Sequence, residues 1–152
     1  MSSSGSEGGA AVADALFGKV NPSGRLSVSW PRDSSSFPLA YNEPSKAYDP
    51  RYPFGYGLSY TRFRLRDLRA PWHARPGARI TASVDVANVG RQAGGDTVLA
   101  FLVAGDGGRR LVAFDRVVAG PGRRATARLA FSAPAGSYRL VVGDLSRPIR
   151  VG

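Results

Sequence analysis

Seven short stretches in which apolar residues alternate with polar ones, or form a brief apolar run, follow one another within residues 58–152. Alternation places successive side chains on opposite faces of an extended chain, so each stretch predicts a β-strand. Turn signals rich in Gly and Pro separate most of them. Seven short strands in so few residues are typical of an immunoglobulin-like β-sandwich. The predicted strands cover residues 62–66, 80–86, 98–103, 111–118, 124–131, 138–142 and 149–151.

Residues 1–57 follow a different pattern. A short helix is predicted over residues 8–17 and a short strand over residues 26–30, and residues 31–57 read as a long loop rich in Tyr and Pro. One helix, one strand and one loop cannot enclose a core between them, and a loop of that length is unusual within a compact domain. We therefore predict that residues 1–57 are the end of a domain whose main body is absent, and that residues 58–152 form a separate domain.

The positive charge is confined to the second part. Of 21 Lys and Arg residues in the chain, five lie in residues 1–57 and are balanced by five acids, whereas residues 58–152 hold 16 Arg and six Asp. The net charge of +10 therefore belongs entirely to the predicted sandwich. Such a domain could attract an anionic polymer or a membrane surface, but Arg placed on solvated strand faces explains the charge equally. We favour solvated Arg and expect neither a nucleic-acid nor a membrane partner.

The residue types that carry chemistry are sparse. The chain has no Cys and a single His, His73, which lies in a loop-like stretch and has no neighbouring nucleophile or acid in the sequence. No spacing typical of a metal site or a phosphate-binding loop is present, and residues 105–108 predict a hairpin turn instead. The acids that could in principle form a hydrolytic carboxylate pair are Glu7, Asp14, Asp33, Glu43 and Asp49. The sequence also predicts neither a signal peptide nor a membrane-spanning segment.

Three separated motifs resemble glycoside hydrolase family 3, which includes β-glucosidases and β-xylosidases. Residues 5–26 are similar to the end of the family's second domain, and residues 111–122 to a strand and turn of its fibronectin type III-like domain, with Asp115 where the family usually has Glu. Residues 52–61 resemble the segment that leads into that third domain. Its first six residues are the candidate structural linker: Tyr52, Pro53, Phe54, Gly55, Tyr56 and Gly57.

The resemblance implies a chain order of barrel, α/β sandwich domain and fibronectin type III-like domain, of which residues 1–57 and 58–152 would be the last pieces. In this family the nucleophile is an Asp of the barrel, and the acid/base Glu lies upstream of the segment matching Gly5. Glu7 therefore does not correspond to it. The resemblance implies no catalytic residue, cofactor or metal in this chain, and contact with carbohydrate only through the missing domains.

Three hypotheses follow from the sequence. The chain is a non-catalytic C-terminal portion of a family 3 glycosidase, or a partner that completes a separately encoded barrel chain, or a stand-alone basic module that binds an anionic polymer. We favour the first, because residues 8–30 predict a helix and a strand without the remainder of their domain.

Overall fold

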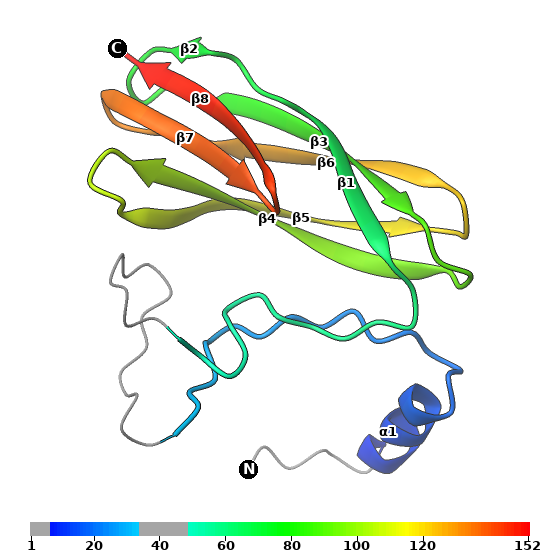
Figure 1. The fold of residues 1–152 in the computed structure, drawn as a ribbon. Coiled ribbons are helices and arrows are strands. Elements are labelled where there is room, and N and C mark those ends of the chain that lie inside the picture. Colours follow the sequence, from blue (N-terminus) through cyan, green and yellow to red (C-terminus); the bar gives the residue numbers. More distant parts are fainter. Residues whose placement is uncertain (1–6, 34–48) are drawn as a thin grey trace.

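The computed structural model describes residues 7–33 and 49–152, in which one short helix precedes two packed β-sheets (Figure 1). The three-stranded sheet has the order β1-β3-β6, and the five-stranded sheet has the order β2-β8-β7-β4-β5. The fold is therefore mainly β, as the sequence predicts. The elements are α1 (Gly8–Leu16), β1 (Phe63–Arg69), β2 (His73–Ala74), β3 (Ile80–Asn88), β4 (Gly94–Ala104), β5 (Arg109–Ala119), β6 (Arg124–Phe131), β7 (Gly136–Val142) and β8 (Leu145–Val151).

The inward-facing residues of both sheets form one hydrophobic core. Alternation produces it directly: in β3, the side chains at positions 80, 82, 84 and 86 are buried while Thr81, Ser83 and Asp85 between them are more exposed. Leu129 of the neighbouring strand β6 and Leu140 of the other sheet belong to the same core and are fully buried. All 16 Arg of residues 58–152 are exposed, which agrees with the expectation that Arg occupies solvated positions.

The turns form where Gly supplies a left-handed backbone. In the β4–β5 hairpin, Gly107 has φ 86° and the amide of Ala104 donates to the carbonyl of Gly108 at 2.9 Å. This confirms the predicted turn at residues 105–108. Between β5 and β6, Gly122 has φ 67° and takes the same role.

One strand escaped the sequence analysis. His73 lies in β2 and not in a loop, and it is paired in parallel register with Arg150 of β8. A strand of two residues is too short to show alternation. Its pairing depends on where β8 ends and not on its own sequence. The seven predicted strands are all present, and several are longer than expected.

The segment before the sandwich is only partly regular. The predicted helix is confirmed as α1, and none of its residues is buried. The predicted strand at residues 26–30 is wrong in extent, because the chain bends at residues 27–28 and only Trp30 forms a β-bridge, with Tyr52. Leu26 and Trp30 form backbone hydrogen bonds with positions between Arg51 and Tyr56, and these bonds are too few to make a continuous ladder. Within the described residues, no helix has the length and apolar character that crossing a membrane requires.

Candidate functional site

The turn at residues 21–25 fastens the N-terminal segment to the outer face of the five-stranded sheet, alongside which it runs (Figure 1). The amide nitrogen Nδ2 of Asn21 donates to the carbonyl of Ala93 at 3.1 Å, just before β4. Ser23 Oγ accepts a hydrogen bond of 3.0 Å from Arg116 Nη2 on β5. Both contacts join positions that are more than 70 residues apart in the sequence.

Arg25 makes the third contact of this turn, an ion pair between its Nη2 and a carboxylate oxygen of Asp96 on β4. The Arg25 side chain is 30% exposed and that of Asp96 only 11%. Water screens a partly covered pair less than a surface pair, so this interaction is stronger than most exposed ion pairs. Arg25 Nη1 also lies 3.5 Å from the carbonyl of Gly57, which ties the turn to the linker. We call the contacts of Asn21, Ser23 and Arg25 with the sandwich the junction.

Two glycines allow the backbones at the junction to approach each other. A Cβ atom at Gly57 would lie 2.3 Å from the carbonyl oxygen of Gly24. One at Gly94 would lie 2.4 Å from Asn21 Nδ2. A side chain at Gly57 would therefore push the turn at residues 21–25 away from the linker, and one at Gly94 would push Asn21 away from the sandwich.

The candidate linker motif lies at the same junction. Phe54 meets Phe101 of β4 edge-to-face, with ring centroids 6.3 Å apart and planes at 80°. Gly55 has φ 81° and sits against the side chain of Leu99. The rings of Tyr52 and Tyr56 lie 4.8 Å apart on the other side of the segment. The motif therefore packs one side on the sandwich and leaves its tyrosines at the surface, each 38% exposed.

Those tyrosines line an open apolar hollow of about 750 Å³. Trp30 and Leu58 on its wall are 58% and 69% exposed, which is unusual for large apolar side chains that line one cavity. Among the described residues that line it, the ionisable groups besides the two phenols belong to Arg25, and that guanidinium is engaged with Asp96. This described lining can therefore bind an apolar or aromatic surface and includes no carboxyl or imidazole group for hydrolysis. It is lined by Gly24, Arg25, Leu26, Trp30, Tyr52, Tyr56, Gly57 and Leu58.

Asn88, at the end of β3, anchors the sandwich side of the linker and was missed by the sequence analysis. It is 1% exposed, and its Oδ1 accepts from Thr61 Oγ1 at 2.6 Å and from the amide of Gly90 at 3.0 Å. Its Nδ2 donates to the carbonyls of Gln92 at 2.7 Å and Ala119 at 2.8 Å. An Asn at the end of an apolar strand usually indicates a turn, so no sequence signal distinguished this role.

The described acids that were considered for a carboxylate pair lie on exposed segments. Asp14 is paired with Lys19 at 3.1 Å, and Asp49 forms a two-pronged pair with Arg32 at 2.8 and 3.1 Å. Hydrogen bonding to Asp49, and then its negative charge, raise the pKa of the Arg32 guanidinium. Glu7 is exposed beside α1 and Asp33 is exposed, and Glu43 lies outside the described residues.

Metal chemistry finds no support in residues 7–33 and 49–152, where no three His or acidic side chains gather into a possible metal site. His73 is exposed, with its ring centroid 5.6 Å from that of Trp72. What the structure brings together is therefore an arrangement for attachment: a junction of polar contacts beside an apolar hollow.

Comparison with known proteins agrees with the motifs. Residues 1–60 match the family described as the glycosyl hydrolase family 3 C-terminal domain. A periplasmic beta-glucosidase of Salmonella typhimurium is 38% identical over 148 residues, covering 80% of this chain and 19% of that protein. A xylan 1,4-beta-xylosidase of Xylanibacter ruminicola is 37% identical, covering 82% of this chain and 16% of that protein. The chain thus spans about a fifth of the length of these relatives.

A solved structure extends the likeness to the fold. The beta-glucosidase of Listeria innocua in complex with glucose aligns with a TM-score of 0.86 and 26% identity, over 97% of this chain and 27% of that one. The alignment covers the N-terminal segment as well as the sandwich, because the sandwich alone would account for a much smaller share of the chain.

Proposed function

Because the chain belongs to glycoside hydrolase family 3, where it corresponds to the C-terminal part of the members, we propose that it is a non-catalytic accessory portion of a β-glucosidase-like enzyme. In this proposal residues 1–57 are the end of the α/β sandwich domain with its linker, and residues 58–152 are the fibronectin type III-like domain. Hydrolysis of β-glycosidic bonds is carried out by the barrel and α/β domains that complete such an enzyme.

The junction carries this proposal. Asn21, Ser23 and Arg25 hold the end of one domain on the face of the next through three side chains of a single turn. Contacts of this kind fix the orientation of two domains, which a flexible linker would leave free. The accessory role is therefore to hold the preceding α/β domain in one position on a rigid sandwich.

The acids of the chain support a non-catalytic role. A retaining glycosidase needs two carboxyl groups about 5 Å apart on either side of the scissile bond. Asp14 and Asp49 are each engaged by a neighbouring cation, on exposed segments without a cleft around them. Catalytic carboxylates must be held rigidly by the surrounding structure, and these segments provide no such support.

The purified chain tests the proposal. We expect no hydrolysis of an aryl β-glucoside above that of a buffer control. Hydrolysis that survived Glu7→Ala but disappeared on substituting another acid of the chain, such as Asp49→Asn, would overturn the non-catalytic assignment. Activity that no such substitution removed would indicate a contaminating enzyme, and a second purification step would separate it.

Exposed apolar residues favour a second candidate, in which the chain completes a separate polypeptide. Leu16 and Phe17 are 72% and 87% exposed at the end of α1, and Trp30 lies in the apolar hollow. The end of α1 and the apolar hollow are thus two places where large apolar side chains lie open to a partner. Mixing the chain with a barrel and α/β polypeptide should then raise aryl β-glucosidase activity, and the two should co-elute. Absence of both effects at micromolar concentrations would remove this candidate.

A further inference from the structure

The outer face of the three-stranded sheet carries arginines from three strands that are not neighbours in the sequence. Cross-strand pairing places Arg64 of β1 and Arg124 of β6 on either side of Ala87. Two rows further along, Arg69 and Arg128 flank Ser83 in the same way. We define the arginine face as these side chains and those between or beside them that point outward: Arg64, Arg66, Arg69, Arg79, Thr81, Ser83, Asp85, Arg124, Thr126 and Arg128.

A bulge in β1 keeps its arginines on this face. The register shifts between Arg66 and Arg69, where Asp67 has φ 53°, a backbone conformation that residues other than Gly rarely adopt. As a result Leu68 is buried in the core at 3% exposure, while Arg66 and Arg69 are both exposed. If the same residues alternated strictly without a bulge, Leu68 would turn outward and Arg69 toward the core.

The arginines of β1 and β6 form two rows, and the shorter outward side chains of β3 lie between them. We call this surface of β3 the floor. Adjacent strands lie about 4.8 Å apart, so the arginines of β1 and β6 are separated by about 10 Å across β3. The floor between them consists of the small side chains of Thr81 and Ser83. Part of this floor is a hollow of about 400 Å³ lined by Arg69, Thr81, Ser83 and Arg128 among others.

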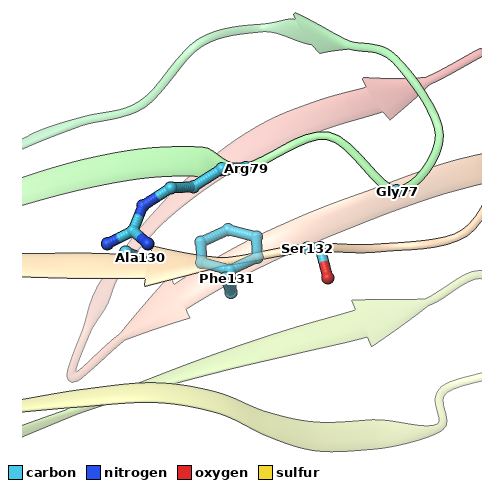
Figure 2. A pocket seen from close by; sticks show the side chains of 5 residues that line it. All are labelled: Gly77, Arg79, Ala130, Phe131 and Ser132. Carbon is cyan, nitrogen blue, oxygen red and sulfur yellow. The ribbon is translucent and has the colours of Figure 1, made fainter.

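The floor continues to the start of β3. Figure 2 shows Arg79 reaching along β6 to Ala130, beside a second hollow of about 320 Å³. Ala130 pairs with Thr81, which lines the first hollow, so the two hollows succeed each other along β3 and β6. The two hollows therefore follow the direction of the strands, as an extended polymer would.

The charge of the arginine face is strongly unbalanced. Of the residues that define it, one is an acid, Asp85, which lies 3.4 Å from Arg69 and accepts a hydrogen bond of 3.0 Å from Thr126. Two further acids border it: Asp67 is exposed in the bulge of β1, and Asp115 of β5 accepts a hydrogen bond of 2.8 Å from the backbone amide of Arg128. Within the part of the chain that the structure describes, no ion pair engages Arg64, Arg66 or Arg128. Exposed like charges whose backbones lie about 10 Å apart, near the Debye length at 0.1 M salt, repel one another weakly at that salt and more strongly at lower salt.

We propose that the arginine face binds an extended polysaccharide bearing carboxylates, a polyuronate. Guanidinium groups pair with carboxylates through two parallel hydrogen bonds, and the hydroxyls of Thr81 and Ser83 match those of a sugar chain. Single-stranded nucleic acid is a poorer fit, because its recognition uses aromatic stacking and every outward position of this face is Arg, Asp, Ser, Thr or Ala. This binding is independent of the accessory role proposed above.

Polygalacturonate is the probe, with the full chain in 20 mM and 200 mM salt and binding measured by calorimetry. We expect binding that weakens at least tenfold at the higher salt, and none to a neutral β-glucan. Arg66→Gln with Arg128→Gln should weaken it at least tenfold. The matched control, Arg139→Gln with Arg150→Gln on the five-stranded sheet, removes the same charge and should change it less than threefold. Equal losses in the two double variants would overturn the site.

A gain of binding provides a second test that misfolding cannot imitate. Asp85→Asn removes the one negative charge of the arginine face while leaving an acceptor for Thr126, so affinity should rise by threefold or more at 20 mM salt. Unchanged or weaker binding by this variant would contradict the proposal. Tighter binding of single-stranded DNA than of polygalacturonate, lost through the same arginines, would overturn the choice of a polyuronate.

Discussion

Asn88 uses all of its side-chain hydrogen-bonding capacity inside the protein. Its Oδ1 accepts two hydrogen bonds and its Nδ2 donates two, and these connect the linker at Thr61, the turn after β3 and the end of β5. A buried polar group with every bond made helps to specify one arrangement, whereas the same group with bonds missing destabilises it. Asn88 therefore holds the end of the linker at Thr61, next to the hydrogen bonds that Asn21 accepts from Ser59 and Tyr60.

Asn88→Ala should lower the free energy of unfolding by about 3 kcal/mol, because it leaves several buried partners without hydrogen bonds. The measurement is the midpoint of urea unfolding followed by circular dichroism. Gln92→Ala is the matched control, since only the backbone carbonyl of Gln92 takes part and its side chain is exposed. A midpoint for Asn88→Ala equal to that of the control would show that this network contributes little.

The Arg25–Asp96 pair is the second residue-scale feature. Asp96 is 8% exposed, so removal of Arg25 leaves a carboxylate that is poorly hydrated and lacks its guanidinium partner. A double-mutant cycle with Arg25→Ala and Asp96→Ala should give a coupling energy of about 1–2 kcal/mol at low salt. Additive single effects would mean that the pair is screened like an ordinary surface pair.

At the scale of elements, residues 24–30 stay against residues 52–57 because the two backbones approach closely. Gly57→Ala places a Cβ atom into the carbonyl of Gly24, so residues 24–30 should separate from residues 52–57 while the sandwich remains folded. Amide exchange at Leu26 and Trp30, which donate to Tyr56 and Tyr52, should then accelerate at least tenfold. Gly105→Ala is the control, because nothing lies within 4 Å of its Cβ position. Unchanged exchange in Gly57→Ala would contradict the close packing.

The elements of the sandwich could be predicted from the sequence, whereas their connections to the N-terminal segment could not. Alternation in residues such as Ile80, Val84 and Val86 reports which face of a strand is buried, and it does so locally. The pairs Arg25–Asp96 and Ser23–Arg116 depend on the path of an irregular segment across 71 and 93 residues. The motif at residues 21–25 marked a turn but not what its side chains contact.

At the scale of the whole molecule, the division into two unlike parts organises both sequence and structure. Residues 58–152 supply a core of their own, whereas no residue of α1 is buried and Phe17 is 87% exposed. The prediction that residues 1–57 are the end of another domain rested on this inability to enclose a core. It remains a prediction. It would explain why the segment exposes apolar residues, because the rest of that domain would cover them.

The arginines show the same contrast between local and global information. Alternation within each strand predicts that the arginines are solvated. It does not predict which of them share one face, because that depends on the order β1-β3-β6 and on the register of both pairings. The arginines that these pairings bring together are Arg64, Arg69, Arg124 and Arg128. Part of the net charge of +10 thus acquires a specific location only in the folded molecule, because six of the 16 Arg of residues 58–152 belong to the arginine face.

The most direct test of the account is a chimera in which this chain replaces the matching C-terminal fifth of the Salmonella beta-glucosidase. The account predicts that the chimera hydrolyses an aryl β-glucoside while the truncated relative does not. It also predicts that Glu7→Gln, Asp14→Asn and Asp49→Asn in the grafted part leave kcat within about twofold, since a lost catalytic carboxylate costs orders of magnitude. A soluble chimera that loses its activity through one of these substitutions would contradict the account.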